Sequence, residues 1–253
     1  MKDLINCYLG GKSMNFLVKN FHLAHATVKN ILLKNNIMIR DREESKRLSR
    51  EKHIEIPEEL LERIEGELLG DGGMYSSKYQ AACKFTSKHL EYMEWLSSCF
   101  EKFSIPLSNG GIKKVQQCDS RTNKIYTRFA FGTKCSIEFK EIYNVWYING
   151  IKTVPQALKL TPNTVLHWWL GDGSINIRSG SLCTDCFTEN EVIFLSNLLN
   201  NTFGLKTKAC PRKNPSGKVI FRIYFPQKSL INLLEIIGES PIKSLSYRWE
   251  IKK

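Results

Sequence analysis

The sequence predicts an α+β protein with two related halves, each in the order αββαββα, behind a small helical domain. The main observation is an internal repeat: ELLGDG at residues 67–72 returns as WWLGDG at residues 168–173, 101 positions later. The helix and strand patterns that follow each copy also recur in the same order. Self-similarity of this kind indicates duplicated structural units that pack against each other.

Composition favours a globular protein that binds a polyanion. The 253 residues are 42% hydrophobic, enough to bury a core, and no apolar run approaches the roughly 18 residues of a membrane span. The first residues lack the pattern of a secretory signal, so we expect a protein that stays inside a cell with its eight cysteines reduced. The net charge of +12 indicates nucleic acid as a partner.

The first forty residues are predicted to form two short helices around a turn. Ser13 is the expected N-cap of a helix over 14–19, and a second helix follows over 24–34. The segment resembles the helix-turn-helix domains of bacterial and phage DNA-binding proteins. That resemblance implies that the second helix enters the major groove and offers Thr27 and Lys29. The alternative is a helical hairpin that only packs against the rest of the chain.

Charge and repeat boundaries predict four segments along the chain. Residues 1–40 form the front domain, and 41–56, where nearly every residue is charged or polar, form a linker. The two repeats then occupy 57–155 and 156–253.

Capping residues place the helices of each repeat. The first helix is predicted over 57–70, and its counterpart begins after Thr161 as N-cap with Pro162 at the first helical position. Middle helices are expected around 89–103 and 189–203, and Thr188 and Glu191 have the spacing of a capping box at the second of these. A third helix follows the last strand of each half.

Alternating residues in the predicted strands separate a core face from a basic face. Ile125 and Val219 belong to the core set. The residues predicted to face DNA are Lys78, Gln80, Lys84, Gln116, Lys124, Arg128, Arg178, Lys206, Lys208, Arg212, Lys218 and Arg222. A solvated outer face is the ordinary alternative for an antiparallel sheet. The excess of Lys and Arg over acidic residues on these strands favours phosphate contacts.

Asp71 and Asp172 are predicted just past the ends of the two repeated helices, beside glycines that allow close approach of another segment. The helix dipole disfavours a carboxylate at that end, so a cation is expected nearby. Mg²⁺ prefers carboxylates together with waters and a substrate phosphate. The pair therefore favours metal-assisted hydrolysis of a phosphodiester.

The two copies that end in LGDG at 69–72 and 170–173 resemble the paired helices of single-chain LAGLIDADG homing endonucleases. The stretches 149–155 and 160–162 share the resemblance, which covers residue 57 to the C-terminus. It implies a pseudo-twofold DNA-binding saddle with the two helices side by side at its centre. Asp71 and Asp172, with Gly70 and Gly171, would hold Mg²⁺ or Mn²⁺ there, and each half would cut one DNA strand.

The resemblance also implies one basic residue near the scissile phosphate in each half. The match places Lys152 there in the first half. In the second half Arg248, in the sequence SYR, and Lys243, in the sequence IK, compete, and Arg248 fits the family's pattern better. The alternative for all three is a basic side chain that covers a helix end.

Packing of the two central helices is predicted to be close and asymmetric. Gly66 and Gly70 leave room for a neighbouring helix in the first copy, whereas the second copy has His167 at the position that matches Gly66. Cys183 and Cys186 form a CxxC without a second ligand pair, so we expect them to line a strand and not to bind zinc.

The function expected from these patterns is site-specific cutting of double-stranded DNA at a long, asymmetric target by a monomer without an obligatory protein partner. A bacterial or phage-infected cell is the expected setting, with an organelle as the alternative. One rival is an RNA-splicing maturase or a non-cutting regulator on the same scaffold, because fold does not fix function. Another is a DNA-binding protein that works through its front domain while the remainder dimerises.

Overall fold

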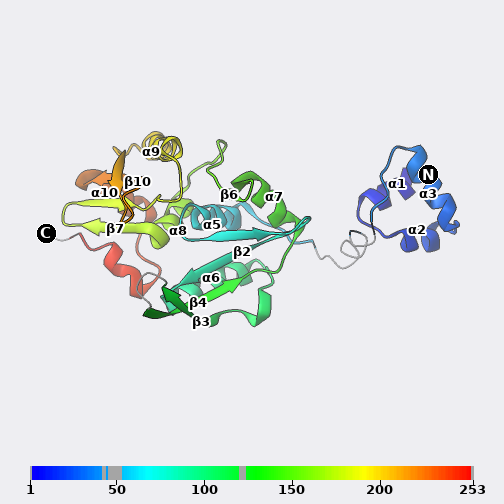
Figure 1. Ribbon diagram of the computed structural model, residues 1–253, viewed down its shortest axis with the longest axis horizontal. Helices are drawn as coiled ribbons and strands as arrows, with labels where there is room; N and C mark the ends of the chain where they lie inside the picture. The colour runs from blue at the N-terminus through cyan, green and yellow to red at the C-terminus, as the bar shows by residue number, and fades with distance from the viewer. Residues whose placement is uncertain (1, 42–43, 45–52, 120–123, 252–253) are drawn as a thin grey trace. The chain divides into compact units, whose positions relative to one another are not determined.

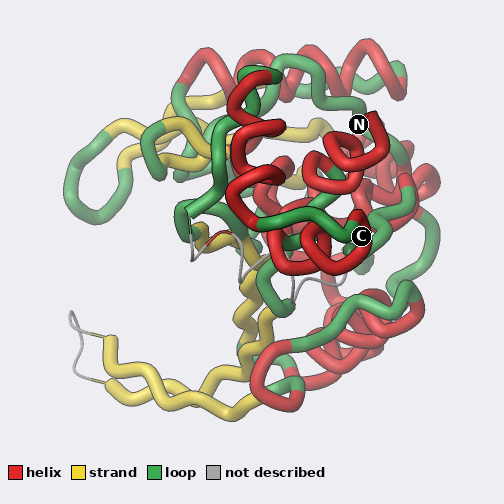
Figure 2. The backbone as a smooth tube through the Cα atoms, turned by 90° about the vertical axis from the view of Figure 1, so that its right-hand side faces the viewer, coloured by secondary structure: helices red, strands yellow, loops and turns green. Residues whose placement is uncertain are grey.

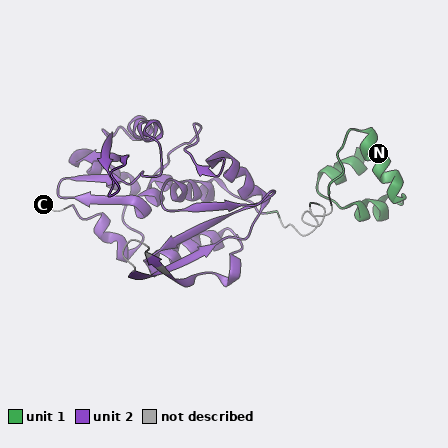
Figure 3. Cartoon of the chain, viewed as in Figure 1, with its two compact units in different colours: residues 1–53 green, residues 54–253 purple. Residues whose placement is uncertain are grey.

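The computed structural model describes residues 2–41, 44, 53–119 and 124–251. The chain divides into two compact units, residues 1–53 and 54–253 (Figures 1 and 3). Most of the linker predicted over 41–56 lies outside the described residues.

In its described residues, the first unit contains three helices around a core of its own. Its helices are α1 (Lys2–Leu9), α2 (Met14–Phe21) and α3 (His25–Lys34). Five side chains are buried together between them: Leu4, Tyr8, Leu17, Val28 and Leu32. The sequence did not predict α1, which supplies Leu4 and Tyr8 and completes this small core.

The turn between α2 and α3 follows the predicted pattern with a small shift. The Ser13 hydroxyl accepts the backbone N–H of Phe16 at 3.1 Å and so caps α2. The helix continues to Phe21, two residues beyond the predicted end, and His22 then adopts a left-handed conformation with φ of 51°. A residue in this conformation ends a helix because it turns the backbone away from the helical path.

The first half of the second unit has the predicted order of elements. These are α5 (Glu58–Leu69), β1 (Gly73–Ser76), β2 (Ala81–Ser87), α6 (Leu90–Lys102), a 3₁₀ turn η1 (Ser108–Gly110), β3 (Lys113–Asp119), β4 (Lys124–Gly132) and α7 (Ile137–Trp146). A small hairpin of β5 (Tyr147–Ile148) and β6 (Ile151–Lys152) follows.

The second half repeats this order, which confirms the predicted α+β duplication. Its elements are α8 (Pro162–Asp172), β7 (Gly173–Asn176), β8 (Ser179–Leu182), α9 (Glu189–Phe203), β9 (Lys208–Lys213), β10 (Val219–Pro226), α10 (Gln227–Ile237) and a 3₁₀ segment η2 (Lys243–Arg248). Thr161 caps α8 with Pro162 at its start, and Thr188 and Glu191 form the predicted capping box of α9.

Each half contains one four-stranded antiparallel sheet. The strand orders are β1-β2-β4-β3 and β7-β8-β10-β9, which are equivalent in the two halves. The β3–β4 hairpin extends away from the helices (Figure 2). Ile125 is 66% exposed, and its predicted place in the core is wrong because this end of the hairpin extends beyond the described helices of the second unit.

Two further strand predictions need correction. Lys78 and Gln80 lie in the turn between β1 and β2, since β2 begins only at Ala81. Val219, predicted in the core, is 50% exposed at the start of β10, where the strand leaves the body of the sheet. Alternation alone does not reveal where a strand passes beyond the helices that cover it.

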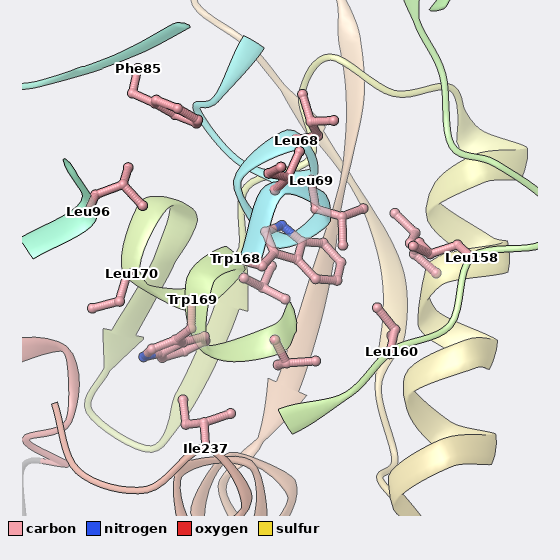
Figure 4. Close-up of a cluster of buried hydrophobic side chains, with 14 of the residues drawn as sticks. Leu68, Leu69, Phe85, Leu96, Leu158, Leu160, Trp168, Trp169, Leu170 and Ile237 are labelled. Atoms are coloured by element: carbon pink, nitrogen blue, oxygen red, sulfur yellow. The ribbon is translucent and has the colours of Figure 1, made fainter. Parts of the chain in front are cut away.

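The helices α5 and α8 pack directly against each other at the centre of the second unit. A Cβ atom at Gly66 would lie 2.3 Å from the carbonyl oxygen of Thr164 and 2.6 Å from Cβ of His167, so only glycine fits there. Trp168 and Trp169 of α8 are fully buried, Trp168 beside Leu68 and Leu69 and Trp169 toward Ile237 (Figure 4). This packing fixes where the two helices end.

Over the part of the chain that the structure describes, none of the helices has the length and apolar character needed to cross a bilayer.

Candidate functional site

The ends of α5 and α8 meet, and this contact brings the two aspartates together. A Cβ at Gly70 would lie 3.5 Å from Oδ2 of Asp172, and one at Gly171 would lie 3.6 Å from the backbone nitrogen of Asp71. Asp71 is exposed in the turn after α5, whereas Asp172 is the last residue of α8 and is half-buried. The prediction that both lie past a helix end therefore holds for Asp71 alone.

A basic side chain binds the carbonyl group just before each aspartate. Lys152 donates hydrogen bonds from Nζ to the carbonyl oxygens of Gly70 at 2.9 Å and Gly72 at 3.0 Å. Arg248 donates from its guanidinium to the carbonyl oxygens of Gly171 at 2.8 Å and Trp169 at 3.1 Å. The structure thus places the two basic residues equivalently, one at each helix end.

Lys243, the competing candidate, lies elsewhere. Its side chain is exposed, and its backbone N–H donates to Glu91 on α6. The sequence offered both Arg248 and Lys243 as the basic residue of the second half. In the structure Arg248 lies at the end of α8 beside Asp172, whereas Lys243 lies at the start of η2.

Local structure explains how Lys152 and Arg248 reach these positions. Asn149 and Gly150 have φ of 52° and 77°, so they form the tight turn that Asn-Gly sequences favour and place Lys152 on β6. At the other site, Trp169 donates from its indole N–H to the carbonyl oxygen of Arg248 at 3.1 Å. Arg248 and Trp169 therefore hold each other by reciprocal hydrogen bonds.

Burial and the neighbouring carboxylate raise the pKa of Asp172 to about 7. Burial also lowers the pKa of the Lys152 ammonium group. These shifts are expected where charged groups converge in a partly dehydrated place, and a cation bound between the carboxylates would counter the shift of Asp172. Strongly shifted groups of this kind are typical of functional sites.

A buried polar cluster lies one helical turn below the aspartates, and the sequence analysis did not find it. Oε1 of Glu67 accepts the Tyr92 hydroxyl at 2.5 Å and lies 2.9 Å from Nδ1 of His167, whose side chain is fully buried. The His167 ring also stacks on Trp95 with 4.9 Å between ring centroids. The predicted asymmetry at this level of the helix pair thus has a structural cause.

A cleft of about 560 Å³ opens beside Asp71. Asp71, Gly171 and Arg248 line it together with residues of the first sheet and α6, namely Thr86, Ser87, Lys88, His89, Tyr92, Cys118, Tyr126, Thr127 and Arg128. Burial lowers the pKa of His89, which precedes α6. Lys88 and His89 were not predicted as site residues, since nothing in their local pattern shows that they line a cleft with Asp71.

Strand register places most of the predicted DNA-facing residues of the first sheet on one face. Lys84 pairs with Gly132, and Lys124 and Arg128 lie at even spacing from it along β4, so the three share a face. Lys113 pairs with Ala130 and joins this face, although it was not predicted.

Gln116 does not share this face with the other predicted residues of the first sheet. It pairs with Thr127 and therefore lies on the opposite face of the hairpin from Arg128. Register across β3 was not available from the sequence, because a shift of one residue would reverse the two faces.

In the second sheet, Lys208, Arg212 and Arg222 share one face by register, since Lys208 pairs with Tyr224 and Arg222 with Cys210. Arg222 makes a bidentate ion pair with Asp185 at 2.6 and 2.7 Å. A carboxylate from the loop after β8 therefore already neutralises this guanidinium, which the pattern of the strands alone did not predict.

The remaining predicted contact residues lie at the surface, outside the strands. Thr27 and Lys29 are exposed on α3, and the exposed Lys206, Lys218 and Arg178 flank β9, β10 and the β7–β8 turn. Cys183 and Cys186 lie in the loop after β8 and not on a strand, so that prediction is wrong; both are free thiols.

Comparison with known proteins identifies the class to which this fold and site belong. The model of the LAGLIDADG DNA endonuclease family matches residues 61–233, more than half of the chain. The chain therefore belongs to this family, as its two LGDG helices had indicated.

Of two relatives of this chain, one is named an mRNA maturase and the other a DNA endonuclease. The chain is 29% identical over 158 residues to cytochrome b mRNA maturase bI2 of Debaryomyces hansenii, a match over 60% of each chain, so it spans less than two thirds of that relative. It is 23% identical over 212 residues to DNA endonuclease I-ChuI of Chlamydomonas applanata, covering 77% of this chain and 96% of the relative.

A solved structure supports the fold. The homing endonuclease I-WcaI, bound to its DNA recognition sequence, matches with a TM-score of 0.69 over 85% of this chain and 96% of its own. At 18% identity this similarity concerns the fold alone.

Proposed function

We propose that the protein is a homing endonuclease that cuts both strands of a DNA duplex at one specific site. The observation that carries this proposal is the meeting of two equivalent helix ends, each with an aspartate and a basic side chain. A duplex has two antiparallel strands, and a pseudo-twofold pair of sites presents one acid to each of them. The family match and the similarity to I-ChuI support the same activity.

The donor set at the helix ends fits Mg²⁺ or Mn²⁺. The carboxylates of Asp71 and Asp172 and the carbonyl groups of Gly70 and Gly171 offer only oxygen, which hard cations prefer. When bound, such a cation supplies charge neutralisation at the phosphate and activation of water. Among the described residues, no group of three or more His, Cys, Asp or Glu side chains comes together, so substrate and water would complete the coordination.

The chain's own residues contribute positioning and positive charge. Lys152 and Arg248 hold the carbonyl groups of Gly70 and Gly171 and so orient the backbone that carries each aspartate. Their charges also lie where negative charge develops during hydrolysis, which is where preorganised cationic groups have the largest effect on rate.

The basic sheet faces are proposed to bind a long, asymmetric duplex target. Lys84, Lys113, Lys124 and Arg128 on one sheet, and Lys208 and Arg212 on the other, would contact phosphates. Each such contact contributes a slope of about −0.9 to the dependence of log affinity on log salt. Because both sites lie on one chain, the protein acts as a monomer in this proposal and requires no protein partner.

The first unit is proposed to bind DNA through α3, with Thr27 and Lys29 toward the major groove. Its resemblance to bacterial and phage helix-turn-helix domains favours a bacterial or phage-infected cell as the setting, with an organelle as the alternative.

The similarity to the bI2 maturase favours RNA splicing as a second candidate function. The two candidates differ in what the aspartates must do. Removing their charge stops DNA hydrolysis but leaves an RNA-binding surface intact, so a maturase would retain splicing in the Asp→Asn variants.

The test is incubation of the purified protein with a randomised duplex library and Mg²⁺, followed by sequencing of the ends produced. A long and nearly unique cut site supports the proposal, whereas the absence of ends with every divalent metal refutes it. On the recovered target, Asp71→Asn and Asp172→Asn are each expected to slow cutting by roughly a hundredfold or more, with binding retained. Equal activity of both variants and the wild type would contradict the assigned role.

A further inference from the structure

The segment that carries Lys152 is hydrogen-bonded to the opposite half of the second unit. Lys152 ends the β5–β6 hairpin of the first half, and two residues later the backbone N–H of Val154 donates to Oε1 of Glu191 at 2.8 Å. Glu191 lies in the first turn of α9, in the second half. Val154 itself is buried, so this hydrogen bond fixes the chain where it leaves the hairpin.

The segment that carries Arg248 shows the reciprocal arrangement. The backbone N–H groups of Lys243 and Ser244 at the start of η2 donate to the two carboxylate oxygens of Glu91, at 3.0 and 2.9 Å. Glu91 lies in the first turn of α6, in the first half. Hydrogen bonding by the Ser244 side chain, and then by these backbone N–H groups, lowers the pKa of the Glu91 carboxyl, which is a charged and therefore strong acceptor at neutral pH.

These two glutamates lie near the start of the middle helix of each half, Glu91 as the second residue of α6 and Glu191 as the third residue of α9. Each stands in the first turn of the middle helix of its half, and each accepts backbone N–H groups from a segment of the other half. Bonds to a carboxylate are the stronger kind of hydrogen bond, and bonds from backbone N–H groups fix a main chain more directly than bonds from side chains do.

We propose that Glu91 and Glu191 are positioning residues, each of which holds in place the basic side chain that serves one of the two cutting sites. This proposal rests on the proposed nuclease function. Lys152 and Arg248 are long side chains that must meet the carbonyl groups of Gly70 and Gly171 from short elements, the two-residue strand β6 and the 3₁₀ segment η2. If the backbone of these segments were not fixed, the positive charge of Lys152 or Arg248 would shift away from the scissile phosphate. A shift of about 1 Å can slow a reaction about a hundredfold.

Glu191 has a second structural task that the experiment must separate. Its Oε2 accepts the backbone N–H of Thr188 at 2.8 Å and the Thr188 hydroxyl at 2.6 Å, which completes the capping box of α9. Thr188→Ala removes the hydroxyl from the capping box but leaves Oε1 free to hold Val154. It is therefore the matched control for Glu191→Ala, and Glu191→Gln is a milder variant that retains one acceptor.

Glu94 supplies the control for Glu91. It is an exposed glutamate on the same helix, three residues further on. Glu94→Ala removes the same charge from α6 without removing an acceptor of the Lys243 and Ser244 N–H groups.

The first measurement is strand-specific cutting of the recovered target, labelled on one strand at a time. Glu91→Ala should slow the strand that Arg248→Ala slows, by about tenfold or more, and leave the other strand within about twofold. Glu191→Ala and Glu191→Gln should slow the strand that Lys152→Ala slows. Nicked duplex should accumulate in these variants but not in Glu94→Ala or Thr188→Ala. An equal loss on both strands, or no loss, overturns the proposal.

The second measurement is amide hydrogen exchange of the full chain without metal or DNA. Glu91→Ala should speed exchange at Lys243 and Ser244 by about tenfold or more, and Glu191→Ala should do so at Val154, with each effect confined to its own segment. Unchanged exchange refutes the attachment itself. If the wild type cuts neither strand, the proposed nuclease function fails, while the exchange result still decides whether the two glutamates hold these segments.

Discussion

Glu67 is a carboxylate that the fold buries between the two central helices, with the Tyr92 hydroxyl and the His167 ring as its partners. Burying such a group is unfavourable unless its hydrogen bonds are satisfied. Here the partners come from α6 and α8, so the cluster joins the two halves. In the described structure, Nε2 of His167 has no hydrogen-bond partner, which makes the cluster depend on its bonds to Glu67.

Replacing Glu67 with alanine should destabilise the second unit. The change leaves the Tyr92 hydroxyl and Nδ1 of His167 buried without a partner, at a cost of about 1–3 kcal/mol for each. Urea denaturation of the purified variant measures the loss. Tyr92→Phe, which removes only one of the two interactions, is the matched control and should cost less. Equal stability of Glu67→Ala and the wild type would show that the cluster contributes nothing to folding.

The contact between α5 and α8 depends at one point on the absence of a side chain. Gly66→Ala would place a methyl group 2.3 Å from the carbonyl oxygen of Thr164, which belongs to a helix backbone and cannot turn aside. The two helices must move apart, so we expect a loss of about 1–3 kcal/mol or more. The rate of DNA cutting should also fall, because moving α5 and α8 apart also moves Asp71 and Asp172 apart.

Gly171→Ala is the control for this prediction. Its methyl group would lie 3.6 Å from the nearest atom, the backbone nitrogen of Asp71, which is ordinary contact. Thermal unfolding should therefore change little. If Gly66→Ala melted with the wild type, the close approach of the two helices would not be needed for folding.

At the scale of helices and strands, the features predicted correctly are those that depend on the local sequence pattern. Caps at Ser13, Thr161 and Thr188 located helix starts, because a side-chain acceptor for the first free N–H groups is a local requirement. The repeat gave the order of elements in both halves. It also gave the two aspartates, whereas Lys152 and Arg248 came from the resemblance to the family, which left Lys243 open beside Arg248.

Features that depend on distant segments were not predictable. The face of Gln116 depends on its pairing with Thr127, and the charge of Arg222 is balanced by Asp185, 37 positions away. Ile125 is exposed because the hairpin extends beyond the helices, although its alternation is that of a core residue. His89 lines the cleft only because α6 begins beside Asp71.

On the scale of the whole molecule, the residues that the structure describes form two separate cores. Leu4, Tyr8, Leu17, Val28 and Leu32 form the core of the first unit, and it shares no buried residue with the large core of the second. The boundary between the units falls at His53, inside the stretch that the sequence predicted as a charged linker. Units with their own cores are expected to fold independently.

A chain that lacks residues 1–53 should therefore unfold at the same temperature as the second unit of the full protein, and it should still cut the target, because Asp71, Asp172, Lys152 and Arg248 all remain. If α3 binds DNA as proposed, the shortened chain should bind its target more weakly. The slope of log affinity against log salt should also become less steep, by about 0.9 for each phosphate that α3 neutralises in the full protein. Lys29→Ala in the full chain should reproduce a part of that change in slope with both units still folded. A shortened chain with unchanged affinity and salt dependence would mean that the first unit does not bind the DNA, and one that fails to fold would mean that the two cores are not independent.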